Sequence, residues 1–167
     1  MNAKLLWLPK IIELTDFGGN FLLYQDYLYS IFKRDFIDSF PKLGRSPVFH
    51  FKEDTNGKRN IFWHLTTEID QTNNQRNSDL RRCERLVWIR PIIKNYLEPE
   101  IFYWEKTNKK EIRSYLFIPD VNYLIILKKT KTIYYLITAY PINYENKKER
   151  FLKEAEFYNP KNAKTAL

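Results

Sequence analysis

The chain of 167 residues carries 28 Lys and Arg against 20 Asp and Glu, a formal net charge of +8 at pH 7, and 17% of its residues are aromatic. An apolar share of 44% is ordinary for a globular protein and excludes wholesale disorder, and the length predicts a single domain over residues 1–167. The net charge favours a polyanionic partner such as nucleic acid, unless it only keeps an aromatic-rich protein soluble.

The single cysteine, Cys83, excludes an intrachain disulfide and a cysteine-based zinc site. The start MNAKLLWLPK has no apolar region long enough for a signal peptide, and no stretch approaches the ~18 to 20 apolar residues of a membrane span. We therefore expect a cytoplasmic protein without a membrane partner.

Residues 20–39 predict an amphipathic helix, because Asn20 can cap it and apolar side chains recur at helical spacing. Gly18 and Gly19 predict a turn before it. The recurring apolar residues are Leu23, Tyr27, Ile31 and Phe32.

Residues 47–66, PVFHFKEDTNGKRNIFWHLT, predict a β-hairpin, because Asn-Gly at 56–57 favours a type I′ turn. Strand alternation places His64 and Thr66 on one face of the second arm, opposite Trp63. The even-length turn puts His64 across from Phe49 and turns His50 to the other face, so the two histidines would not form an acid–base pair. From position alone, His64 is either catalytic or a half-buried structural histidine.

Residues 71–77 predict a polar loop, and residues 78–97 a helix that Ser78 caps and Pro91 ends or kinks near Arg90. The first turns carry a cationic face. Guanidinium groups there could bind phosphate, although a solvated charged face is the commoner reason for such a run. The arginines of this face are Arg81, Arg82 and Arg85.

Four apolar segments between residues 100 and 142 predict an antiparallel meander, and residues 146–158 a short closing helix. Residues 159–167 are expected to fray. Because helices come early and antiparallel strands dominate later, the fold class is α+β: N-terminal helices, a hairpin with a four-stranded meander, and a short C-terminal helix.

Two hydroxyls lie close together near the end of the last predicted strand. Alternation places Thr138 and Tyr140 on one face with Tyr134 and Leu136, so both hydroxyls could contact a phosphate. Equally, Thr and Tyr are simply good strand residues.

Several familiar motifs are absent from the sequence, including the P-loop, G-x-G-x-x-G, G-x-S-x-G and paired metal-binding histidines. No compact group of carboxylates suits a metal. Any phosphodiester cleavage would therefore be metal-independent, and we expect no cofactor.

The order of these features resembles the barnase–EndoU–colicin–RelE superfamily of small ribonucleases, especially its phage-associated and toxin-like branches. The strings that carry the resemblance are FWHLTTE, RRCERLVWIRPII and YYLITAYPI with the basic helix that follows, and it runs from about Phe21 to Tyr158. It implies RNA as substrate, attack of the ribose 2′-hydroxyl to leave a 2′,3′-cyclic phosphate, and a cognate antitoxin or immunity protein as a possible partner.

The resemblance also implies roles for particular residues. His64 would be the base, and Arg82 or Arg85 would stabilise the phosphorane. Thr138 and Tyr140 would supply the hydroxyl pair, and the second proton-transfer role falls to Tyr140 or to a lysine. Further residues expected to bind substrate are Thr66, Arg81 and Lys128.

Two other classes of function stay open. One is a non-catalytic nucleic-acid-binding module, in which Trp88, Trp104 and Arg113 provide stacking and phosphate contacts. The other is a protein-interaction component of a phage, defence or toxin–antitoxin assembly, whose aromatic residues lie in a partner groove.

Overall fold

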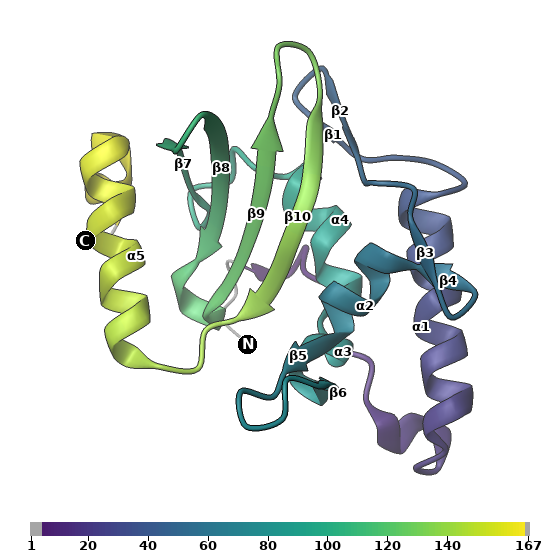
Figure 1. Cartoon of the computed structure of the whole chain (residues 1–167). Coiled ribbons are helices and arrows are strands. Elements are labelled where there is room, and N and C mark those ends of the chain that lie inside the picture. The colour runs from purple at the N-terminus through teal and green to yellow at the C-terminus, as the bar shows by residue number, and fades with distance from the viewer. Residues whose placement is uncertain (1–4, 166–167) are drawn as a thin grey trace.

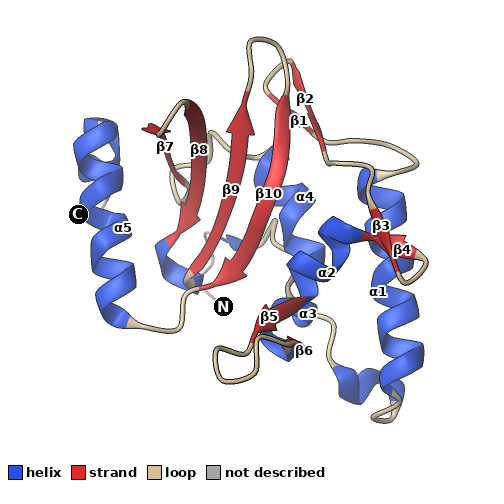
Figure 2. Ribbon diagram, in the orientation of Figure 1, coloured by secondary structure: helices blue, strands red, loops and turns tan. Residues whose placement is uncertain are grey.

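The computed structural model describes residues 5–165, in which a six-stranded sheet lies between a group of helices and the C-terminal helix α5 (Glu145–Tyr158) (Figure 1). The fold class is α+β, as the order of predicted elements indicates (Figure 2). No helix in this part of the chain is long and apolar enough to cross a membrane.

The first long helix, α1 (Phe21–Phe36), follows a short 3-10 helix, η2 (Leu14–Phe17), and forms where its cap predicts. Asn20 Oδ1 accepts a hydrogen bond from Leu23 N at 3.2 Å, which satisfies a backbone donor that the first turn leaves unpaired. The helix buries one face, formed by Tyr24, Leu28, Ile31, Phe32, Asp35 and Phe36.

The predicted four-stranded meander is confirmed, and a hairpin extends it to the sheet order β1-β2-β10-β9-β8-β7. All neighbours pair antiparallel except β2 and β10, which run parallel and place Tyr135 beside Phe49. The strands are β1 (Lys42–Leu43), β2 (Ser46–Phe49), β7 (Phe102–Asn108), β8 (Glu111–Ile118), β9 (Tyr123–Lys129) and β10 (Tyr134–Pro141), with a 3-10 helix, η4 (Pro119–Val121), between β8 and β9.

Both faces of the meander are buried, each against different helices. Leu116, Ile125 and Leu136 point to the larger core, which α1 and the helices of residues 60–94 complete. Phe117 and Leu124 point the other way and pack with Phe151 of α5. Strand alternation therefore gives the sheet two faces. The face toward α1 and the helices of residues 60–94 is called the helix face, and the face toward α5 is called the α5 face.

The hairpin predicted over residues 47–66 is only partly correct. Its turn is confirmed, because Asn56 and Gly57 have φ of 51° and 73° between β3 (Asp54–Thr55) and β4 (Lys58–Arg59). The second arm is wrong: residues 60–66 form the helix α2 (Asn60–Thr66), and Phe49 pairs with Tyr135 rather than with His64. A short apolar run suits either a strand or a helix, and packing of α2 against β10 and α3 decides for the helix.

The arginine-bearing helix predicted over residues 78–97 is divided into α3 (Leu80–Glu84), the 3-10 helix η3 (Leu86–Trp88) and α4 (Ile89–Lys94). Its cap is Asp79 rather than Ser78, since Asp79 Oδ1 accepts from Arg81 N at 2.9 Å. The break falls at Arg85, not near Arg90. Pro91 lies in the first turn of α4, where a missing N–H costs little.

Two smaller features border these elements. Strands β5 (Thr67–Ile69) and β6 (Arg76–Ser78) pair around the polar loop, which is therefore shorter than predicted. At the C-terminus, Asn159 Nδ2 donates to Tyr103 O at 2.7 Å, and a 3-10 helix η5 (Pro160–Thr165) follows. Residues 166–167 lie outside the described part, and the fraying expected of residues 159–167 stays a prediction.

Candidate functional site

A β-bulge in β10 determines which way the two predicted hydroxyls point. Leu136 pairs with Leu127, but the next paired residue is Thr138, opposite Ile126, so Ile137 is the extra residue. Thr138 and Tyr140 do share a face, but it is the α5 face. The predicted common face with Leu136 is wrong, because the bulge reverses the alternation within the strand.

His64 lies on α2, half-buried, in a hollow of about 410 Å³ that Thr138 also lines. The side chain of Arg76 approaches it from β6, with Nη2 2.8 Å from His64 Nδ1. A guanidinium can only donate, so Nδ1 accepts this bond and the ring carries its proton on Nε2. His64 is thus oriented by a residue twelve positions away in sequence.

The electrostatic surroundings keep His64 neutral. Burial lowers its pKa below the ordinary 6.5, and the positive charges of Arg76 and Arg82 lower it further. A neutral imidazole at neutral pH is the form that a general base requires, although its Nδ1 lone pair is occupied while Arg76 stays in place.

Arg82 connects α2, α3 and the end of β10. Its Nη1 donates to His64 O at 3.1 Å, its Nε lies 3.3 Å from Asp79 Oδ2, and its guanidinium lies over the Tyr140 ring at 5.2 Å from the centroid. Burial raises the pKa of Tyr140, and the charges of Arg82 and Arg150 oppose that rise. Tyr140 therefore keeps its proton and can donate it.

The structure links four of the eight predicted site residues in two ways. His64 and Thr138 line one hollow, and Arg82 contacts both the His64 carbonyl and the Tyr140 ring. The structure places Arg85 elsewhere, because Arg85 Nη1 donates to Arg81 O and Glu84 Oε2, both at 2.9 Å, and its guanidinium lies over the Trp88 ring. Arg85 thus stabilises the junction between α3 and η3.

The remaining three predicted residues lie in different surroundings. Thr66 is 3% exposed and donates its hydroxyl to Phe62 O at 2.9 Å, so it ends α2 instead of facing a phosphate. Arg81 is exposed on α3. Lys128 lies on β9, with Nζ 2.6 Å from Glu111 Oε1.

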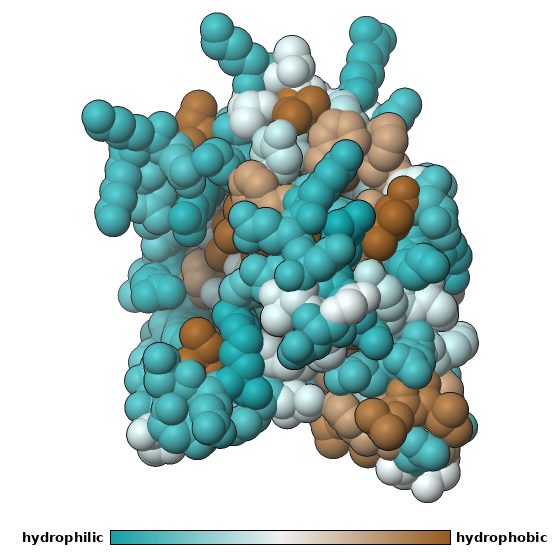
Figure 3. Space-filling view, turned by 45° about the vertical axis from the view of Figure 1, so that its right-hand side comes forward, coloured by the Kyte–Doolittle hydropathy of each residue, from teal (hydrophilic) through white to brown (hydrophobic). Residues whose placement is uncertain are grey.

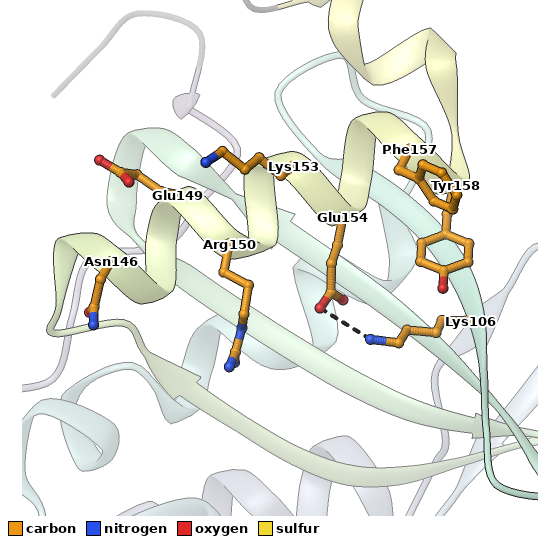
Figure 4. A pocket seen from close by; sticks show the side chains of 8 residues that line it. All are labelled: Lys106, Asn146, Glu149, Arg150, Lys153, Glu154, Phe157 and Tyr158. Carbon is orange, nitrogen blue, oxygen red and sulfur yellow. Dashed lines mark ion pairs between the residues drawn. The ribbon is translucent and has the colours of Figure 1, made fainter.

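Two cationic side chains of this region, Arg76 and Arg150, are not predicted from the sequence. Arg76 belongs to a polar loop in sequence and reaches His64 only through the β5–β6 pairing. Arg150 projects from α5 toward the sheet and lines one hollow with Lys106 of β7, whose Nζ pairs with Glu154 at 3.1 Å (Figure 4). Both lie on the α5 face or over it.

Among residues 5–165, no three His, Cys, Asp or Glu side chains come together in a way that could hold a metal ion. Comparisons with protein-family models, with curated proteins and with solved structures find no match for this chain. The geometry of the site therefore has to support the function by itself.

Proposed function

We propose that this protein is a metal-independent endoribonuclease whose active site is formed by His64, Arg82, Thr138 and Tyr140. The observation that carries the proposal is a histidine kept neutral between two arginines, in one hollow with Thr138, where one of the arginines, Arg82, also lies over the Tyr140 ring. These groups come from elements far apart in sequence, and together they supply a base, a proton donor and positive charge, which RNA cleavage requires.

In the proposed reaction, His64 removes the proton of the ribose 2′-hydroxyl. The 2′-oxygen then forms a bond to phosphorus, and the bond from phosphorus to the 5′-oxygen breaks. Tyr140 gives its proton to the leaving 5′-oxygen, while Arg82 and the Thr138 hydroxyl stabilise the charge on the phosphorane. The products are a 2′,3′-cyclic phosphate and a free 5′-hydroxyl, and water returns the proton from His64 to Tyr140.

Arg76 has a specific part in this proposal. Its guanidinium occupies the Nδ1 lone pair of His64 at 2.8 Å in the free protein. A phosphodiester anion is a stronger acceptor for a guanidinium than a neutral ring nitrogen, so substrate binding would draw Arg76 away and free the base. Arg76 is therefore proposed to orient His64 in the free protein and to contact the phosphodiester once RNA is bound.

Cleavage of RNA in EDTA tests the proposal. The purified chain is expected to leave cyclic-phosphate ends, and His64→Ala and Tyr140→Phe to lose about a hundredfold or more in rate. Tyr144→Phe is the matched control, since Tyr144 is 64% exposed and its ring lies beside Lys147 of α5. Full activity in His64→Ala, or intact tRNA, mRNA and rRNA with the wild type, would contradict the proposal.

A non-catalytic nucleic-acid-binding module is the second candidate, favoured by the cations on the α5 face. Lys106, Arg113 and Lys128 pair across neighbouring strands there, about one third exposed each. The stacking role expected of Trp88 and Trp104 is wrong, because both are buried, at 7% and 1% exposure. A gel shift that weakens steeply with salt, without cleavage, would favour this candidate.

A toxin function with a protein partner would extend the first proposal. The exposed side chains of Leu22 and Leu23, at 71% and 59%, favour a partner that covers the start of α1. Growth arrest on expression that a neighbouring gene relieves would support a toxin with an antitoxin or immunity protein. Normal growth on expression would contradict the toxin function but not the proposed RNA cleavage.

A further inference from the structure

A second hollow of about 650 Å³ lies directly beside the candidate active site, and aromatic rings form most of its wall. Phe51 and Tyr135 stack with their ring planes 3° apart and their centroids separated by 4.8 Å. Phe40 and Phe49 form a tilted pair, also with centroids 4.8 Å apart. Phe40 and Phe51 are 43% and 51% exposed, so each presents ring surface to solvent.

Phe51 joins this aromatic hollow to the hollow of His64, because its side chain lines both. Along β10, Tyr135 lines the aromatic hollow and Thr138 the other. Three residues of strand span at most roughly 10 Å, so one bound chain can reach both hollows. A nucleic-acid chain with a phosphate at His64 would thus place a neighbouring base at Phe51.

The charge around the aromatic hollow suits the same ligand. Lys52 and Arg59 line it, and Arg59 Nη1 pairs with Asp54 Oδ1 at 2.8 Å. No carboxylate is among the residues that line this hollow. Exposed rings with cations beside them are the arrangement that single-stranded nucleic acid uses for base stacking and backbone contact.

We infer that the aromatic hollow is a nucleobase subsite, which stacks an unpaired base of single-stranded RNA on Phe51 next to the phosphate that is cleaved. The inference rests on the proposed function for its placement, because the subsite adjoins the catalytic residues. It adds that the substrate is single-stranded at this position, since a base inside a duplex cannot reach the ring. It also places Phe51 between the bound base and the phosphate that is cleaved, because Phe51 lines both hollows.

Binding of a short fluorescent 2′-O-methyl RNA tests the subsite separately from cleavage, because the probe lacks the 2′-hydroxyl that attacks. At one fixed salt concentration, Phe51→Leu is expected to weaken binding about fivefold or more, since it keeps an apolar side chain but removes the ring. Phe51→Tyr should bind like the wild type. Tyr144→Leu is the control for an exposed ring elsewhere, at 64% exposure.

Abasic probes complete the experiment. Removing the base that stacks on Phe51 should weaken wild-type binding by the same factor as Phe51→Leu, and should add nothing further in that variant. This result would keep the subsite even if no RNA is cleaved.

The subsite is overturned if Phe51→Leu binds the probe as tightly as the wild type, or if no abasic position weakens binding. It is also overturned if Phe51→Leu leaves RNA binding intact but abolishes binding of a neutralising protein, because the hollow would then hold a protein side chain. Thermal unfolding of each variant confirms that the exposed substitution leaves the fold intact.

Discussion

At the residue scale, the contact between Arg76 and His64 influences the protonation of the proposed base. Their contact at 2.8 Å is the only one between a histidine and an arginine side chain among the described residues. It determines the tautomer of the ring and lowers its pKa, in addition to the larger effect of burial. The chain has two histidines, so His64 can be followed by itself in an NMR titration.

Arg76→Gln is predicted to raise the pKa of His64 toward 6.5, because the amide keeps a donor for Nδ1 but removes the positive charge. The ring-proton shift of His64 against pH measures this directly. Arg45→Gln removes the same charge at an exposed position and should leave the titration unchanged. An unchanged pKa of His64 in Arg76→Gln would show that the positive charge of Arg76 does not affect the protonation of the ring.

The same pKa predicts how stability depends on pH. A folded pKa below the ordinary 6.5 means that the unfolded chain binds the proton more readily, so acid destabilises the folded state. The stability that neutral His64 contributes is fully present above pH 6.5 and is lost as pH falls through the lowered folded pKa. Denaturant unfolding between neutral and mildly acidic pH should show this loss in the wild type, and His64→Gln should reduce it.

At the scale of elements, Asp79 both caps α3 and pairs with Arg82. It accepts hydrogen bonds from Arg81 N and Arg82 N, and its second carboxylate oxygen lies 3.3 Å from Arg82 Nε. The start of α3 thus holds the arginine that lies over Tyr140. Loss of the cap and loss of the charge should have different effects.

Asp79→Ala is predicted to lower the free energy of unfolding by about 1 kcal/mol, because two backbone donors lose their acceptor. Asp79→Asn should retain most of this stability, since Asn is an equally good cap, but it removes the charge beside Arg82. Denaturant unfolding of the two variants measures the difference. Equal destabilisation by both would mean that the ion pair, and not the cap, stabilises this segment.

At the scale of the whole molecule, the sheet separates the larger core from a face that carries a row of cations. The larger core lies between the helix face and α1 to α4, while the α5 face carries Lys106, Arg113 and Lys128 in one cross-strand row. The surface in Figure 3 is mainly hydrophilic, with apolar side chains gathered in separate patches. Two carboxylates, Glu154 and Glu111, pair with these three cations, so the row keeps a net positive charge.

Arg150→Gln is predicted to weaken binding of any RNA sequence to a similar degree and to reduce the slope of log affinity against log salt by about one phosphate contact. Arg150 projects over the α5 face (Figure 4). Lys94→Gln removes a charge on α4, behind the helix face, and serves as the control. Equal salt slopes for both variants would mean that RNA does not follow the α5 face.

The sequence by itself determined the elements that depend on local physical chemistry. Asn20 caps α1, Asn56 and Gly57 form a turn that needs positive φ, and alternation with short polar turns defines the meander. Each signal acts within a few residues, so no tertiary contact is needed to recognise it. The α+β class follows from the order of these elements.

Only the tertiary structure decided how the site is assembled. Residues 60–66 become a helix because of what they pack against, and the bulge at Ile137 turns Thr138 and Tyr140 to the α5 face. The contact of Arg76 with His64 depends on a hairpin whose loop carries no hydrophobic pattern. Each of these features depends on packing or strand pairing between segments far apart in the sequence, so the local pattern of residues does not predict it.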